Sequence, residues 1–234
     1  MNDQRMVRWL GPLALGFLVC VVLGFFVLSS TSSPDQNASS ASIVNYYATH
    51  ATRELATIYV IGVGLGLLAF FVSGLRIALR AASGGHSWLP TTAFVGGLLY
   101  IGGFAVQGLI HLALVEAGYN HRADIADTLN FIGNNSQVPV FLGLTVMALA
   151  TGICILAGST LPAWLGWLSI VVGLVTAAGP VGFFGFLASP IWMTILGFTV
   201  AHRAAAPQSV PTGETDAAPD SASARGHRRL IPKH

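Results

Sequence analysis

Long uninterrupted apolar runs recur along this chain, and they limit its possible folds more than any other feature. Six of them can be marked, at residues 9–28, 56–75, 92–116, 138–156, 163–178 and 181–201. A helix of about 20 apolar residues is long enough to cross the hydrocarbon core of a bilayer. The runs are continuous rather than alternating, which is typical of membrane helices and not of barrel strands. The sequence therefore predicts an all-α polytopic membrane protein with six transmembrane helices in a bundle.

The composition agrees with this prediction. Charged residues make up 9% of the 234 residues and hydrophobic residues 53%, whereas soluble domains contain about 25% charged residues. Because water could not solvate so much apolar surface, we expect the lipid bilayer to be the main partner of the chain. No nucleic-acid-binding patch and no glycine-rich phosphate loop occurs, so the sequence predicts no nucleic-acid partner and no cofactor. Cys20 and Cys154 lie within apolar runs and are interpreted as small apolar side chains.

The chain divides into three parts. Residues 1–8 form a short polar N-terminus, residues 9–203 the six-helix transmembrane domain, and residues 204–234 a tail of Ala, Pro, Ser, Thr and Asp that we expect to be disordered. The apolar core of the first run exceeds the roughly 7–15 residues of a signal peptide, which favours a retained anchor. The tail ends in a basic cluster around Arg228. This cluster either lies on anionic lipids of the inner leaflet or is solvated.

The distribution of positive charge predicts the orientation. With six spans, 9 of the 11 Lys and Arg residues fall on one side of the membrane, and only Arg53 and Arg122 fall on the other. The side with more positive charge is normally cytoplasmic. Both termini are therefore expected in the cytoplasm, and residues 29–55 and 119–137 are expected outside.

Several local patterns predict how the helices pack. Small residues recur at every fourth position of the first run, and a second such pair occurs in the next run, which is typical of close helix contacts. These positions are Pro12, Gly16, Cys20 and Gly24, followed by Gly62 and Gly66. Pro190 is expected to kink the sixth run.

Two further helical segments are expected on the outer side. Residues 43–55 have helical periodicity and should continue into the second span. In the second outer loop, Ile125, Leu129 and Ile132 recur at helical spacing, which predicts a short interfacial helix ending near Gly133.

A first candidate site combines His50 and Glu54, which are four residues apart, with His111. All three are expected at the outer face, where Asp124 or Asp127 could join them. Three such ligands and a water molecule form the usual catalytic zinc site. The alternative is that these side chains are only solvated or cap helix ends.

A second candidate site lies in the third run. Gln107 and His111 share a helical stripe with Tyr100, and both interrupt an otherwise apolar segment. A polar side chain at membrane depth is costly unless it is paired, so Gln107 should have a partner, with Tyr59, Tyr100 or a Ser or Thr as candidates. Such a pair could be purely structural, or it could be part of a small-ligand or proton-linked site.

Two segments carry a resemblance to a known group of proteins. Residues 161–173, LPAWLGWLSIVVG, open the fifth run, and residues 43–59 lead into the second. Both resemble segments of uncharacterised six-helix integral membrane proteins of high-GC, actinobacterial-type bacteria. The resemblance implies the six-helix layout and a bacterial plasma membrane. That family has no assigned activity, so no functional residue is carried over.

The function predicted first is a non-enzymatic membrane protein, either an accessory or sensor-like subunit or a binder of a small apolar ligand. No catalytic residue is predicted, and His50, Glu54, Gln107 and His111 form the candidate ligand-binding cluster. One alternative is a membrane-embedded metal-dependent hydrolase that uses the outer His and Glu residues. The other is a small-solute transporter that uses Gln107 and His111. Transport of cations has less support, since no acidic residue lies inside an apolar run except Glu116 at an edge.

Overall fold

The computed structural model describes residues 3–28, 33–83, 88–158 and 160–205, and these residues form no β-strand. Helices account for most of them, which confirms the all-α prediction. The α-helices are α1 (Asp3–Arg8), α2 (Leu10–Val22), α3 (Ser40–Ala82), α4 (Leu89–Tyr119), α5 (Ala123–Asn135), α6 (Val138–Leu156), α7 (Ala163–Ala177) and α8 (Gly182–Ala205). A π-helical segment, η1 (Leu23–Leu28), continues α2, and a 3₁₀ turn, η2 (Gly179–Val181), precedes α8.

Within the described ranges, five helical stretches are long and apolar enough to cross a membrane, which indicates a membrane protein. They are Leu10–Leu28, Ser40–Ala82, Leu89–Tyr119, Ala123–Leu156 and Gly182–Ala204. Helix α7 is also apolar, but its 15 residues fall short of the roughly 20 that a bilayer usually requires. The sixth crossing therefore stays a prediction.

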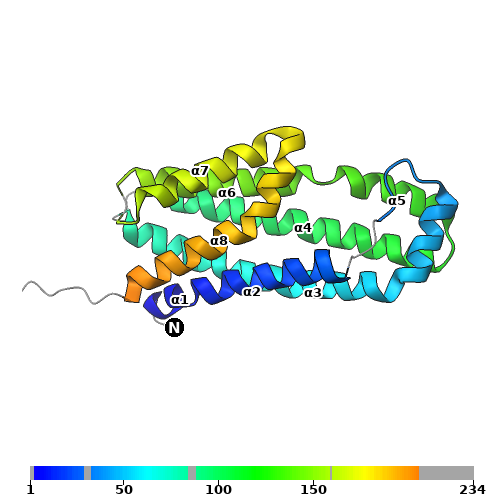
Figure 1. Ribbon diagram of the computed structural model, residues 1–234, viewed down its shortest axis with the longest axis horizontal. Helices are drawn as coiled ribbons and strands as arrows, with labels where there is room; N and C mark the ends of the chain where they lie inside the picture. The colour runs from blue at the N-terminus through cyan, green and yellow to red at the C-terminus, as the bar shows by residue number, and fades with distance from the viewer. Residues whose placement is uncertain (1–2, 29–32, 84–87, 159, 206–234) are drawn as a thin grey trace, which may run out of the picture.

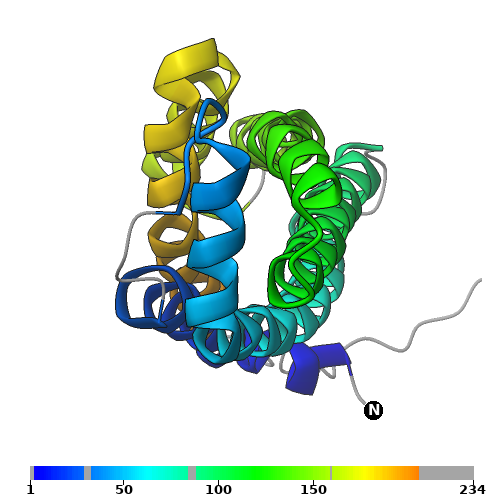
Figure 2. The ribbon, with the colours of Figure 1, turned by 90° about the vertical axis from the view of Figure 1, so that its right-hand side faces the viewer.

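The helices pack in a ring. Going round it, α2 contacts α3, α3 contacts α4, α4 contacts α6, α6 contacts α7, α7 contacts α8, and α8 returns to α2. The molecule is elongated, and α1 and the last turns of α8 lie at the same end (Figure 1). Seen along the long axis in Figure 2, α2, α3 and α8 lie on one side of the ring and α4 and α6 on the other. Their buried side chains form one continuous bundle core.

Helices α4 and α6 approach each other most closely at glycines. A Cβ atom on Gly143 would collide with the backbone of Tyr100, and one on Gly96 would collide with the backbone of Met147. A Cβ on Gly103 would lie 2.8 Å from the backbone nitrogen of Val140. Small residues commonly line helix contacts in membrane proteins, because they allow backbones to meet.

The small-residue stripe of the first run packs against α3. A Cβ on Gly16 would lie 2.8 Å from Leu67, and one on Gly24 would lie 2.7 Å from Ile61. Cys20 fills the space above Gly64, where an added Cβ would come within 2.9 Å of the cysteine Cβ.

The expected contact at Gly62 and Gly66 is wrong. A Cβ on either glycine would meet no atom within 4 Å, whereas Gly64 on the opposite side of α3 lies under Cys20. The spacing of small residues identified α3 as a helix that others approach closely, but it identified the wrong face.

Helix α3 extends well beyond the bundle, which confirms the continuous helix expected from residue 43 into the second span. Its first turns run across one end of the bundle before the helix turns along it (Figures 1 and 2). We call these turns (residues 40–55), the end of α4 (residues 111–119) and α5 the cap. The cap has a small hydrophobic core of its own, made by Ile43, Tyr47, Leu114, Val115, Ala117 and Ala126.

Helix α5 confirms a helix in the loop of residues 119–137, although it ends at Asn135 rather than at Gly133. Ile125 and Ile132 are exposed, and Leu129 packs against the cap core. The position of this helix at a membrane surface stays a prediction.

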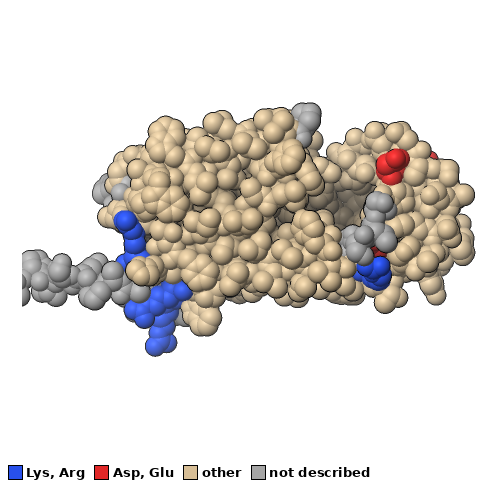
Figure 3. Space-filling model, in the orientation of Figure 1, with Lys and Arg blue, Asp and Glu red and all other residues tan. Residues whose placement is uncertain are grey.

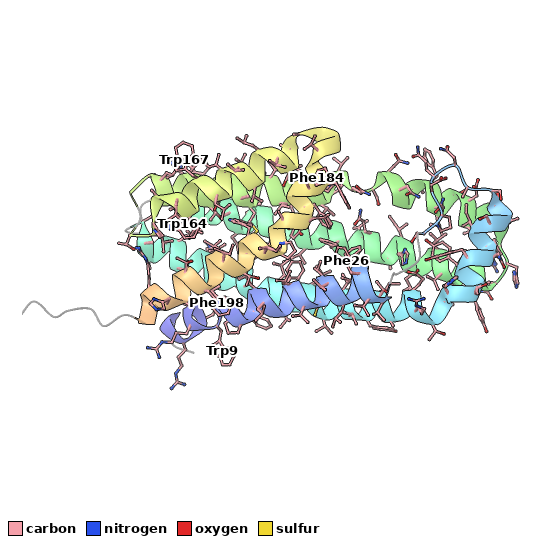
Figure 4. The ribbon with its side chains drawn as sticks, in the orientation of Figure 1. Trp9, Phe26, Trp164, Trp167, Phe184 and Phe198 are labelled. Carbon is pink, nitrogen blue, oxygen red and sulfur yellow. The ribbon has the colours of Figure 1, made fainter. Side chains whose placement is uncertain are left out.

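Charged side chains gather at the two ends of the molecule. In Figure 3 the view shows basic residues at the α1 end, acidic residues with a basic group at the cap, and an uncharged surface between them. Arg5 and Arg8 belong to α1, Arg80 to the last turn of α3 and Arg203 to the last turn of α8. Figure 4 shows Trp9, Trp164 and Trp167 towards this same end, and all three are exposed.

Helix α8 contains Pro190, as expected, and it changes direction along its length in Figure 1. It continues to Ala205, two residues into the predicted tail. The rest of that tail, including the basic cluster, lies outside the described residues.

Candidate functional site

A cavity of about 550 Å³ lies between the bundle and the cap. Its walls come from η1, α3, α4, α5 and the coil before α3. Phe104 of the bundle core faces it from one side, and Tyr47 and Leu114 of the cap core face it from the other. The cavity therefore separates the two hydrophobic cores. Figure 3 shows the molecular surface hollowed between the bundle and the cap.

The part of the cavity next to the bundle is apolar. It is lined by Phe25, Ile58, Ile61, Leu65, Phe104, Leu109 and Ile110, among others. Phe186 of α8 lies behind this wall, with its ring centroid 6.4 Å from that of Phe25 and 5.6 Å from that of Phe104. Phe141 of α6 joins them, 6.0 Å from Phe186. Aromatic rings from four elements thus close the bundle end of the cavity.

The part next to the cap is polar, and a buried carboxylate lies at its centre. Glu54 is 2% exposed. The Tyr46 hydroxyl donates to its Oε1 at 2.8 Å, and His111 Nε2 donates to its Oε2 at 2.9 Å. The edge of the Tyr47 ring contacts the His111 ring, with 5.6 Å between centroids. Two donors therefore compensate a carboxylate that would otherwise be costly to bury.

Helix α4 places two further polar side chains on the cavity wall. The His111 side chain is 30% exposed, and its Nδ1 atom has no hydrogen-bond partner among the described residues. Gln107 also lines the cavity, and its amide has no partner in residues 33–83, 88–158 or the other described ranges.

The hydrogen bond expected for Gln107 is therefore not seen among the described residues. The Tyr100 hydroxyl instead lies 3.2 Å from Ser189 Oγ inside the bundle. Tyr59 is 73% exposed and does not line the cavity. Gln107 faces the cavity, and within the described ranges its amide is not hydrogen-bonded to a neighbouring helix.

The structure brings Glu54 and His111 together but leaves His50 apart. The His50 Nδ1 atom donates to the Tyr46 carbonyl at 2.9 Å, and its ring stacks on that of Tyr46, with 4.6 Å between centroids. Asp124 and Asp127 are exposed and do not line the cavity. Over the described ranges, no three His, Cys, Asp or Glu side chains are placed to hold a metal ion. The geometry does not support the three-ligand site suggested by the sequence.

Sequence reasoning missed three residues of the site. Tyr46 lies eight residues before Glu54 and four before His50, a spacing that indicates one shared helical stripe. Tyr47 joins the cap core beneath His111. Asn130 of α5 is 2% exposed, lines the cavity and donates to the Asp35 carbonyl at 2.8 Å. It was missed because the buried side of α5 carries Ala126 and Asn130, not the larger apolar residues.

Comparison with known proteins adds no further constraint. No protein-family model, no curated protein and no solved structure matches this chain.

Proposed function

We propose that this chain is a multi-pass protein of the bacterial plasma membrane that binds a small, mostly apolar ligand in the cavity between bundle and cap. Its role would be that of a non-enzymatic accessory or sensor-like protein. The cavity itself is the observation that carries this proposal. Its volume of about 550 Å³ falls in the range of about 300–1,000 Å³ that is usual for ligand pockets. A mostly apolar wall with a few polar groups is also typical of such pockets.

The proposal includes six crossings with both termini in the cytoplasm. The basic side chains at the α1 end support this orientation under the positive-inside rule (Figure 3). The exposed tryptophans near that end suit a membrane interface (Figure 4). In this arrangement α7 crosses the membrane in one direction, η2 lies at the turn, and α8 crosses back. This orientation puts the cap and the cavity on the outer side.

The two alternative functions have less support. A metal-dependent hydrolase would need a further ligand beside Glu54 and His111, and the His50 side chain is directed to the Tyr46 backbone. A transporter would need a path through the bundle. Phe186 and the rings it contacts fill the bundle next to the cavity.

Photolabelling tests the proposal. The protein in lipid nanodiscs would be titrated with a long-chain alkyl diazirine that has no polar head group, and labelled peptides would be mapped by mass spectrometry. We expect saturable labelling of the peptides 58–65 and 104–112, which contain many of the residues that line the cavity. Labelling of lipid-facing residues should rise in proportion to the probe concentration. Labelling of the cavity peptides that never saturates would contradict the proposal.

The glycines supply matched controls. Gly62 and Gly108 line the cavity, while Gly66 and Gly102 do not, and a Cβ on any of the four would meet no atom within 4 Å. Gly62→Phe and Gly108→Phe should fill the cavity and abolish saturable labelling. Gly66→Phe on α3 and Gly102→Phe on α4 should leave it unchanged. If the two cavity variants and the two control variants reduced saturable labelling equally, the labelling would not report on binding in the cavity.

A further inference from the structure

The geometry of the cavity points to the chemical class of its ligand, and this inference rests on the proposed function. We propose that the ligand is an uncharged single-chain amphiphile. Its hydroxyl-bearing head group lies between Gln107 and His111, and its hydrocarbon chain lies against the apolar wall that contains Phe25 and Phe104.

The charges around the cavity exclude a charged head group. None of the described residues on its wall is Lys or Arg, and Glu54 is the one acidic side chain among them. Both carboxylate oxygens of Glu54 already accept hydrogen bonds from the protein. An anionic head group would lose its hydration here with no cationic side chain on the described wall to replace it, which is costly. A cationic head group would meet only Glu54 on that wall, whose two oxygens already accept hydrogen bonds. An uncharged head group avoids this cost.

Two unused hydrogen-bonding side chains define the head group further. Because a carboxylate only accepts, the His111 Nε2 atom carries the hydrogen donated to Glu54. In the neutral ring Nδ1 is then an acceptor, and it has no partner among the described residues. Gln107 has an amide that both donates and accepts. The two residues are four apart on α4, so their Cβ atoms lie about 5–6 Å from each other.

A hydroxyl group matches this pair of side chains. It can donate to His111 Nδ1 while it accepts from the Gln107 amide, and a glycerol head group offers two hydroxyls for the two positions. The Nδ1 atom of His111 and the Gln107 amide, which have no hydrogen-bond partner among the described residues, then gain one from the ligand.

The apolar part of the cavity fits a hydrocarbon chain. Gly62 of α3 and Gly108 of α4 both line it, and neither is covered by another atom within 4 Å of an added Cβ. The hollow opens on the side of the molecule, beside the uncharged surface (Figure 3). A ligand can therefore enter from the lipid phase with its head group towards the cap. The volume of about 550 Å³ suits one chain with a small head group rather than a two-chain phospholipid.

Three photoprobes with the same diazirine-bearing chain test the head group. One is a glycerol monoester, one is the free carboxylate and one carries a phosphocholine group. Each would be titrated into the protein in nanodiscs, with saturable labelling of residues 104–112 as the readout. We expect half-saturation at the lowest concentration with the glycerol monoester. If no probe labels this peptide saturably, the proposed function fails. If a charged probe binds as well as the glycerol ester, the proposed function stands and the head-group inference is wrong.

Two substitutions of Gln107 test separately the hydrogen bond to the head group and the absence of a cationic side chain on the described cavity wall. Gln107→Leu should weaken binding of the glycerol ester about fivefold, the effect of one hydrogen bond. Gln36→Leu, at an exposed glutamine outside the cavity, should change nothing. Gln107→Arg introduces a permanent cation, so the preference should reverse in favour of the carboxylate probe. Unchanged selectivity in both Gln107 variants would overturn the placement of the head group.

Discussion

At the scale of single residues, Glu54 joins the two long helices within the cap. It belongs to α3, and His111, one of its two partners, belongs to α4. The other partner, Tyr46, lies two helical turns earlier on α3. A carboxylate that is only 2% exposed is tolerated because donors meet both oxygens, and it fixes the relative position of the two helices in the cap.

Removing one of these donors should therefore destabilise the protein. Tyr46→Phe deletes the hydroxyl that donates to Glu54 Oε1 and leaves a buried oxygen without that partner. We expect the free energy of unfolding to fall by about 1–3 kcal/mol, measured by denaturant unfolding in detergent. Tyr59→Phe is the control, because that side chain is 73% exposed. A loss of similar size in both variants would show that the hydrogen bond is not what stabilises the cap.

The sequence predicted part of this site. Glu54 and His111 were expected on the same outer side, and the structure places them in direct contact. The contact between Tyr47 and His111 could not be predicted, because it depends on the rotation of α3 against α4. That rotation is set where Gly118 of α4 packs against Tyr47. His50 lies over Tyr46 within α3 itself, outside the cavity.

At the scale of whole helices, the contact between α4 and α6 depends on glycine. The two helices meet backbone to backbone at Gly96 and Gly143, and Gly103 faces Val140 farther along. Since lipid tails are as apolar as the helices, such contacts gain their stability from close packing rather than from the removal of water. A methyl group at the crossing would force the helices apart.

Gly143→Ala tests this contact. The added methyl would overlap the backbone of Tyr100, which cannot rotate away as a side chain can. We expect a loss of about 1–3 kcal/mol in the free energy of unfolding, as for other overpacked cores. The matched control is Gly102→Ala on α4, where the added Cβ meets no atom within 4 Å. An unchanged unfolding midpoint for Gly143→Ala would mean that the helices can separate at little cost.

The helices themselves were predictable to different degrees. The bounds expected for the fourth span agree with α6 (Val138–Leu156) at both ends, because Pro139 and the glycine-containing turn after Leu156 delimit it. The first turns of α3 have mixed polarity because they form part of the cap. The sequence therefore did not show where the membrane-spanning part of α3 begins. Hydrophobic periodicity reports on burial, and it does not distinguish burial by protein from burial by lipid.

At the scale of the whole molecule, the two ends differ: the bundle core lies towards one end, the cap core lies at the other, and the cavity lies between them. The bundle core is surrounded by an uncharged surface, and the cap core lies beyond it among most of the described acidic residues (Figure 3). The cavity lies at the boundary between them. In the proposed orientation this boundary coincides with the outer surface of the hydrocarbon core. A ligand with one polar end would bridge the same two environments there.

The orientation can be tested with two positions on one helix. Asn45 is exposed in the cap, and Ala81 is exposed at the opposite end of α3, next to Arg80. Each would be replaced by cysteine in a background in which Cys20 and Cys154, the free cysteines of the structure, are replaced by alanine. Intact cells would then be treated with a membrane-impermeant maleimide.

Asn45→Cys should react in intact cells, whereas Ala81→Cys should react only after the membrane is made permeable. The reason is the concentration of arginines at the α1 end (Figure 3), which resist transfer across the bilayer during insertion. The opposite pattern would put the cap and its cavity in the cytoplasm. Reaction of both positions in intact cells would mean that the long axis of the bundle does not span the membrane, and the lateral entry of a lipid-like ligand would then lose its basis.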